Sequence, residues 1–162
     1  VLPTVPHVCE SVHAAVAGWP QQPEITVDAG AKWRAFGEAD AALIASGTVS
    51  LELALAGVPM VSTYRLDPVM RAASRLVTVW SALLPNLIAD RPVVPEFYDA
   101  YVRPQNLARH LEALFCDSGL RAWQKAGFAE IRRRMQTPRP AGELAVEAVL
   151  ETMRQSATGN RR

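Results

Sequence analysis

The stretch AALIASGTVSLELALAGVPMVSTY, residues 41–64, decides the fold of this chain. It opens with a continuous apolar run at residues 41–45, which is typical of a strand covered on both faces. A helix follows Gly47 and runs to about Ala56, and residues 60–64 form the next strand. The stretch therefore predicts a compact β-α-β unit with a right-handed crossover.

Short β-prone segments and amphipathic helices extend this pattern in both directions. Residues 1–4 are typical of the end of a strand, residues 24–27 of a short strand, and residues 83–88 of a final short strand. Apolar residues recur at helical spacing through the last third of the chain. Strands that alternate with helices predict an α/β fold: a Rossmann-like three-layer parallel sheet with helices on both faces, which ends in an all-helical segment.

The domain is expected to cover residues 1–154, followed by a mobile, polar tail at residues 155–162. The last predicted helix follows Pro140. The apolar residues that it is expected to turn inward are Val146, Val149, Leu150 and Met153.

Bulk composition excludes several classes of protein. The chain has 162 residues, 49% of them hydrophobic, and a formal net charge of +1. That hydrophobic fraction is typical of a globular chain, and so balanced a charge does not suit non-specific binding to nucleic acid, which relies on clustered positive charge. The two cysteines, Cys9 and Cys116, and the three histidines share no metal-ligand spacing. No uninterrupted apolar run is long enough to span a membrane.

The tripeptide Ser46-Gly47-Thr48 lies where a predicted strand ends and a helix begins. The first N–H groups of a helix have no intrahelical partner, and they point along the positive end of the helix dipole. A phosphate oxygen satisfies these groups, and a glycine lets it come close. Ligands of open α/β sheets also lie beyond the carboxyl ends of the strands. The tripeptide therefore predicts a phosphate site, although a plain helix cap would use the same residues.

Glu52 is a carboxylate in a helix that is otherwise apolar. It lies one turn after Thr48 on the same helix face, since residues four apart are neighbours. A carboxylate at this distance from a diphosphate site is placed to accept both hydroxyls of a ribose. The alternative is an ion pair with a nearby arginine such as Arg65.

Several segments give the chain a resemblance to the C-terminal domain of the lipid-A-disaccharide synthase family, over about residues 1–136. The segments that carry it are Ser46-Gly47-Thr48 with Leu51-Glu52, Leu55 to Val61, Tyr64-Arg65, Leu84-Pro85-Asn86-Leu87-Ile88, and Arg91 to Glu96. The first of these is shared with many nucleotide-sugar glycosyltransferases of the GT-B fold. The segment from Leu84 to Glu96 is much more specific to the family.

The resemblance implies an enzyme of two Rossmann-like domains that transfers 2,3-diacylglucosamine from UDP to 2,3-diacylglucosamine 1-phosphate, with inversion and without a required metal or cofactor. It implies a cytoplasmic location, peripheral to the inner membrane. It also implies a role for individual residues. Ser46, Gly47 and Thr48 would hold the diphosphate, Glu52 the ribose, and Arg65, Asn86 and Gln105 would lie near the donor. No catalytic residue is expected in this chain, because the family's base lies in the N-terminal domain.

The chain departs from the family pattern at its start. The N-terminal domain and a Gly-rich, Arg-containing phosphate loop before Val1 are absent, and the first strand and helix of the domain are expected to be absent too. We therefore expect a piece of a longer protein that has no transferase activity alone and at best weak affinity for UDP. The acylated substrates leave contact with a membrane surface open, and the oligomeric state is undetermined.

Three alternatives remain open. The first is another GT-B glycosyltransferase and the second a UDP-sugar 2-epimerase, although residues 84–87 argue against both. The third is a non-catalytic module on the same fold. For membrane contact, the apolar stretch from Pro68 to Leu84, which includes Arg71 and Arg75, is either a core helix or a lipid-facing patch.

Overall fold

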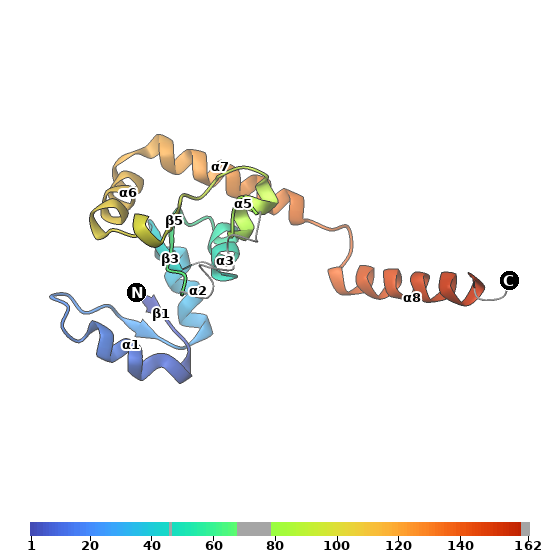
Figure 1. Ribbon diagram of the computed structural model, residues 1–162, viewed down its shortest axis with the longest axis horizontal. Coiled ribbons are helices and arrows are strands. Elements are labelled where there is room, and N and C mark those ends of the chain that lie inside the picture. The colour runs from blue at the N-terminus through green and yellow to red at the C-terminus, as the bar shows by residue number, and fades with distance from the viewer. Residues whose placement is uncertain (46, 68–78, 160–162) are drawn as a thin grey trace. The chain divides into compact units, whose positions relative to one another are not determined.

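The computed structural model of the chain describes residues 1–45, 47–67 and 79–159 (Figure 1). Helices and strands alternate along its first two thirds, and its last third is helical. The elements are β1 (Leu2–Pro3), the 3-10 helix η1 (Pro6–Val8), α1 (Cys9–Val16), β2 (Ile25–Thr26), α2 (Ala29–Glu38), β3 (Ala42–Ala45), α3 (Val49–Ala56), β4 (Met60–Tyr64), α5 (Leu84–Ala89), β5 (Glu96–Tyr98), the 3-10 helix η3 (Asp99–Tyr101), α6 (Pro104–Cys116), α7 (Ser118–Met135) and α8 (Ala141–Gly159).

All strand pairs in the described residues are parallel. β3, β4 and β5 form one sheet in that order, with Ala42 opposite Met60 and Ser62 opposite Glu96. β1 and β2 form a second, two-stranded sheet. The prediction of a parallel α/β fold is confirmed, and the β-α-β unit at residues 41–64 is β3-α3-β4.

The final short strand expected at residues 83–88 is wrong, because α5 occupies this segment. Pro85 lies in the first turn, where its fixed φ suits a helix, and Asp90 ends the helix in the left-handed conformation at φ 54°. The last strand is β5 instead. Its three residues follow Pro95 and are too few to show a periodic pattern.

Helices cover both faces of the β3-β4-β5 sheet. The consecutive residues Met60 and Val61 are fully buried and belong to different hydrophobic clusters, as expected when successive side chains point to opposite faces. Residues of α2, α3, α5 and α7 build the cluster around Met60, and residues of α6 build the one around Val61. The three-layer arrangement is therefore confirmed for this sheet.

β3 is less covered than its continuous apolar run predicted. Ile44 is buried on the Met60 side, but Leu43, on the opposite side, is 49% exposed. The expectation of a strand covered on both faces is wrong for β3, because the cluster on the Val61 side gathers over β4 and β5.

A buried glutamine on α7 forms hydrogen bonds with the backbone at the start of β4. Gln124 is 1% exposed; its Oε1 accepts the Met60 N–H at 2.9 Å, and its Nε2 donates to the Met60 carbonyl at 3.0 Å. β5 reaches β4 only from Ser62 onward, so these two groups of Met60 have no strand partner on that side. Gln124 therefore takes the place of a neighbouring strand and ties α7 to the sheet.

The chain divides into two compact units, Val1–Ile131 and Arg132–Arg162. In the second unit, α8 continues to Gly159, so the helix extends into the expected tail. The expectation that its apolar residues face inward is wrong. Val146, Val149, Leu150 and Met153 lie on one stripe of the helix and are between 46% and 63% exposed, and neither described core cluster includes them.

The apolar stretch from Pro68 to Leu84 is described only in part, since residues 68–78, with Arg71 and Arg75, lie outside the described residues. Of the rest, Leu83 is fully buried in the core, whereas Val79 and Trp80 are more than half exposed. Within the described ranges, none of the helices combines the length and the apolar character needed to cross a bilayer.

We predict that Gln124→Leu destabilises the fold by about 2–4 kcal/mol, because it keeps the side-chain volume but leaves two buried backbone groups of Met60 without partners. Urea unfolding followed by circular dichroism measures the change. Gln136→Leu is the control at an exposed glutamine, with an expected change within about 0.5 kcal/mol. Equal effects of the two substitutions would contradict this role of Gln124.

Candidate functional site

The turn between β3 and α3 has a backbone that requires glycine. Gly47 has φ +147°, a conformation that other residues rarely adopt. A Cβ built on Gly47 would meet no atom within 4 Å, so the space above this residue is open. Ser46 lies outside the described residues. The turn thus offers an exposed backbone at the start of a helix, as a phosphate site needs.

Thr48 precedes α3 but does not cap it through its side chain. It is already in helical conformation at φ −63° and ψ −28°, and its hydroxyl makes no capping hydrogen bond. Ser50 contacts the turn instead: it is fully buried, and its Oγ donates to the Gly47 carbonyl at 2.6 Å. The plain helix cap that the sequence left open is therefore not what Thr48 does. Thr48 as a residue is exposed.

Glu52 is engaged by a cation that the sequence analysis did not identify. Its Oε2 lies 2.8 Å from Lys32 Nζ, and the two side chains are 34% and 26% exposed. Glu52 therefore forms its ion pair with Lys32 of α2. The alternative, an ion pair between Glu52 and Arg65, is wrong. The carboxylate is also less buried than expected, because only Ser50, Leu53 and Ala54 of α3 are buried.

Aromatic rings hold Lys32 in this position. Its Nζ lies 5.0 Å from the ring centre of Trp33 and 5.8 Å from that of Phe36, and the two rings meet edge to face. A cation over a ring face is attracted by the ring's quadrupole. Since Phe36 is buried in the core cluster, the pair fixes α2 against α3. In the sequence, the feature that could have indicated this ion pair is a lysine, Lys32, close to the aromatic residues Trp33 and Phe36.

The carboxyl ends of β3, β4 and β5 lie along one edge of the sheet, because the strands are parallel and in register. Arg65 follows β4 directly and is exposed at this edge, beside the turn that follows β3. Asp99 joins the ends of β5 and β4, since its Oδ1 accepts the Leu66 N–H at 3.0 Å. Gln105 is exposed in the first turn of α6. Arg65 and the Gly47 turn therefore follow the carboxyl ends of neighbouring strands. No described contact joins Gln105 to this edge of the sheet.

Asn86, a predicted donor-site residue, is 1% exposed and makes structural hydrogen bonds. Its Oδ1 accepts the Val94 N–H at 2.8 Å. Its Nδ2 donates to the Val94 carbonyl at 2.9 Å and to Glu96 Oε1 at 2.7 Å. Both N–H groups of the carboxamide are therefore used within the protein. Asn86 holds α5 to the segment that leads into β5.

Glu96 is the centre of this network. Besides Asn86, it accepts hydrogen bonds from the hydroxyls of Ser81 and Tyr98 and from the Ala82 N–H. Burial, the hydrogen bond to Glu96 and the charge of Glu96 together raise the pKa of the Tyr98 hydroxyl well above its usual range, so Tyr98 stays a donor. The same segment contacts α7, where Arg91 Nη2 lies 3.2 Å from Glu130 Oε2.

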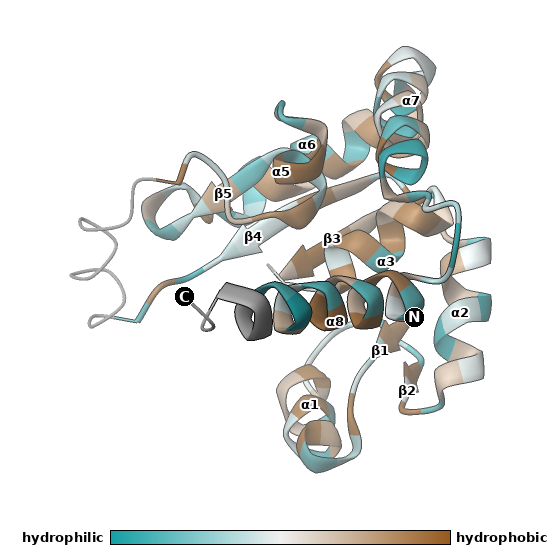
Figure 2. Ribbon diagram, turned by 90° about the vertical axis from the view of Figure 1, so that its right-hand side faces the viewer, coloured by the Kyte–Doolittle hydropathy of each residue, from teal (hydrophilic) through white to brown (hydrophobic). Residues whose placement is uncertain are grey.

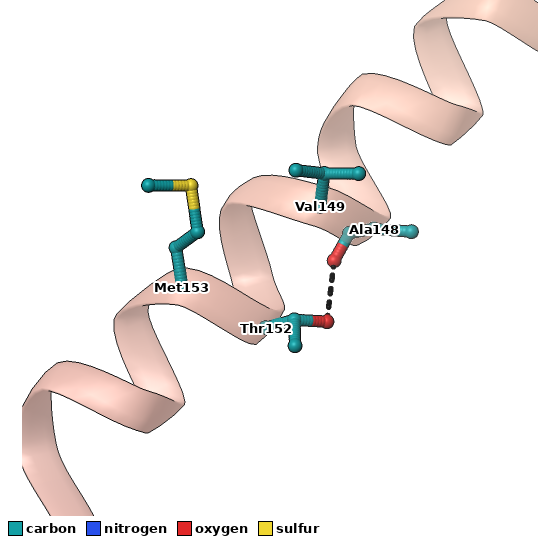
Figure 3. A pocket seen from close by; sticks show the side chains of 4 residues that line it. All are labelled: Ala148, Val149, Thr152 and Met153. Carbon is teal, nitrogen blue, oxygen red and sulfur yellow. Dashed lines mark hydrogen bonds between the residues drawn. The ribbon is translucent and has the colours of Figure 1, made fainter.

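A surface hollow lies on α8 and shares no residue with the Gly47 site. Ala148, Val149, Thr152 and Met153 line it, and all four come from one helix (Figure 3). The Thr152 hydroxyl donates to the Ala148 carbonyl at 2.9 Å. The hollow therefore offers mainly apolar contacts and no cluster of groups for chemistry.

In the described part of the chain, no three His, Cys, Asp or Glu side chains gather as metal ligands. The Gly47 site instead offers a helix N-terminus, the exposed residue Thr48 and the Lys32–Glu52 pair. These groups suit an anion and a diol, and a ribonucleoside diphosphate carries both, in its diphosphate and its ribose.

Comparison with known proteins identifies the family of the chain. A family model described as lipid-A-disaccharide synthetase matches residues 3–146. Among the curated relatives named lipid-A-disaccharide synthase are three from different genera. The one from Nitrobacter hamburgensis is 47% identical over 96% of this chain, that from Rhodospirillum centenum 42% over 99%, and that from Bradyrhizobium diazoefficiens 40% over 95%. The chain spans about 40% of the length of each of these relatives.

We predict that Asn86→Asp destabilises the protein by about 2–4 kcal/mol, because a carboxylate cannot donate to Val94 and would repel Glu96. Thermal and urea unfolding measure this loss. The matched control is Asn106→Asp in α6, which we expect to change stability by less than about 0.5 kcal/mol. An Asn86→Asp protein that is as stable as the parent chain but binds UDP less well would contradict the structural role.

Proposed function

Since the chain belongs to the lipid-A-disaccharide synthetase family, we propose that it is the donor-binding half of a glycosyltransferase that makes lipid A disaccharide. The reaction transfers 2,3-diacylglucosamine from UDP to 2,3-diacylglucosamine 1-phosphate and releases UDP. In this proposal residues 1–154 bind the UDP part of the donor. The other half of the enzyme supplies the base and the acceptor site.

One observation carries the proposal: the open turn at Gly47 is followed by a helix that presents Glu52 one turn later. We assign the turn, Ser46 to Thr48, to the diphosphate and Glu52 to the ribose hydroxyls. The contact with Lys32 uses only Oε2 of Glu52, and it holds the carboxylate in place for a diol. Arg65 lies on the same edge of the sheet and is assigned to the donor as a further cation. Gln105 is retained as a weaker candidate.

The turn would stabilise the leaving group. As the glycosidic bond breaks, negative charge builds on the β-phosphate of UDP. N–H groups at the start of α3 and the positive end of its dipole are fixed before the reaction, so they need no reorganisation to meet that charge. The proposed mechanism requires no metal or other cofactor, since these fixed donors, with Arg65 as a further cation, would meet the charge of the diphosphate.

The acylated substrates place the reaction at a membrane. We propose that the complete enzyme works on the cytoplasmic face of the inner membrane as a peripheral protein. Val79 and Trp80 are exposed and apolar, and they are candidates for contact with the acyl chains or the bilayer surface. Nucleic acid is not a partner in this proposal.

A titration with UDP tests the site. We expect UDP to shift the amide resonances of Gly47, Thr48 and Glu52 in ¹⁵N-labelled chain at millimolar concentration. Glu52→Gln should weaken UDP binding about tenfold, because it replaces a charged acceptor of two hydroxyl hydrogen bonds by a neutral one.

Glu38→Gln in α2 is the matched control, since Glu38 is exposed and lies on the helix that carries Lys32. We expect it to leave the affinity for UDP unchanged. An unaltered affinity in Glu52→Gln would remove the ribose assignment. The absence of any shift at Gly47 and Thr48 would remove the diphosphate assignment.

A further inference from the structure

Asp99 has a strained backbone at the carboxyl edge of the sheet. In the described part of the chain, the non-glycine residues with a positive φ are Asp99, at 45°, and Asp90, at 54°. Residues with a side chain rarely adopt this left-handed conformation, although aspartate tolerates it better than most. Asp99 follows β5 directly and begins η3, whereas Asp90 ends α5. Strain of this kind persists where the surrounding contacts hold it, and it is frequent at functional sites.

The hydrogen-bonded ladder between β4 and β5 leads to Asp99. The two strands are parallel and lie side by side (Figure 2). Every second residue of a parallel strand directs its N–H to the same neighbour. Since the Ser62 N–H donates to the Pro95 carbonyl, the Leu66 N–H belongs to the same row of donors. Its regular acceptor, four residues after Pro95, would be the Asp99 carbonyl.

The side chain of Asp99 takes the place of its carbonyl in this row. The carbonyl turns into η3, where it accepts the Val102 N–H at 3.1 Å. Asp99 Oδ1 accepts the Leu66 N–H at 3.0 Å instead. The carboxylate therefore continues the pairing of β4 by one step beyond the end of β5. It fixes the backbone on both sides of Arg65, because Tyr64 is still paired with β5 and Leu66 is held by Asp99.

Arg65 combines this held backbone with an exposed side chain. Its guanidinium makes no hydrogen bond, ion pair or ring contact with the residues that the structure describes. Two nearby cations are already engaged. Lys32 pairs with Glu52, and Arg103, which follows η3, donates from Nε to the Ala100 carbonyl. Of these three cations, Arg65 is the one whose charged group is left for an anion.

We propose that Asp99 is a positioning residue for Arg65: by holding the Leu66 N–H, it fixes the Arg65 backbone so that the guanidinium meets a diphosphate bound at the Gly47 turn. Without this bond, the chain after Tyr64 could separate from β5, and Arg65 would lose more conformational entropy on binding the anion. The inference rests on the proposed function, because it takes UDP as the ligand of this edge.

Titration of the 162-residue chain with UDP, followed by NMR, tests the inference. Asp99→Gly suits the positive φ but has no acceptor for the Leu66 N–H. We expect it to weaken UDP binding about fivefold. The melting temperature should stay within about 3 °C of the parent value, because the relieved strain offsets the lost hydrogen bond. Removal of a carboxylate near an anion would by itself strengthen binding, so the expected effect is opposite in sign to a charge effect.

Asp99→Asn and Asp90→Gly are the matched controls. Asparagine tolerates a positive φ and keeps an oxygen acceptor, so Asp99→Asn should bind UDP at least as tightly as the parent chain. Asp90→Gly makes the same change at the other strained aspartate, and we expect it to leave the affinity for UDP unchanged. In an Arg65→Met background, Asp99→Gly should weaken binding by less than about 1.5-fold, because the group that it positions is gone.

Amide exchange at Leu66 reports the hydrogen bond itself, and it should be about tenfold faster in Asp99→Gly than in Asp99→Asn. Equal exchange in the two variants would overturn the inference. So would parent-like affinity in Asp99→Gly, or an equal loss of affinity with and without Arg65. Leu66→Pro removes the donor of the same bond, and it takes the place of Asp99→Gly if that variant does not fold.

The parent chain separates these failures from a failure of the proposed function. If UDP shifts the amides of Gly47 and Thr48 in the parent chain and the variants behave otherwise than expected, only the role of Asp99 is overturned. If UDP shifts neither amide, the proposed function and this inference both fail.

Discussion

The parallel pairing of β3 with β4 is the interaction on which the rest of the structure depends. β4 is buried on both faces, with Met60 in one cluster and Val61 in the other, so it fixes the helix layers above and below the sheet. The register that sets Ala45 opposite Thr63 also sets where both strands end. As a result the Gly47 turn and Arg65 come to the same edge. The pairing of β3 with β4 therefore sets where the proposed nucleotide site lies, because it sets where the Gly47 turn begins.

The segment from Leu84 to Glu96 shows that a family-specific motif can be architectural. Asn86 forms hydrogen bonds with Glu96 and with the backbone of Val94, and Arg91 contacts Glu130 of α7. These contacts hold the short strand β5 to α5 and to the residues before α5, and three residues of strand would pair weakly alone. The motif identifies the family because this attachment needs particular side chains. Its value for identifying the ligand is therefore indirect.

The ion pair between Lys32 and Glu52 links fold and site. It holds α2 against α3, and α2 is the crossover between the two sheets. The same pair sets the position of the carboxylate that we assign to the ribose. Since both side chains are about one-third exposed, the pair contributes modestly to stability, and its main effect is to orient the carboxylate.

Sequence alone determined the β-α-β unit at residues 41–64, the need for glycine at position 47, and the family, because each rests on local patterns or on residue identity. It predicted a strand at residues 83–88, where Pro85 and the hydrogen bonds of Asn86 stabilise a helix, and it did not find β5, which is too short to show a period. Only the tertiary structure decided that Lys32 pairs with Glu52 and that Gln124 takes the place of a neighbouring strand beside Met60. These are contacts between residues that are distant in the sequence, and packing selects them from many partners that the sequence leaves equally open.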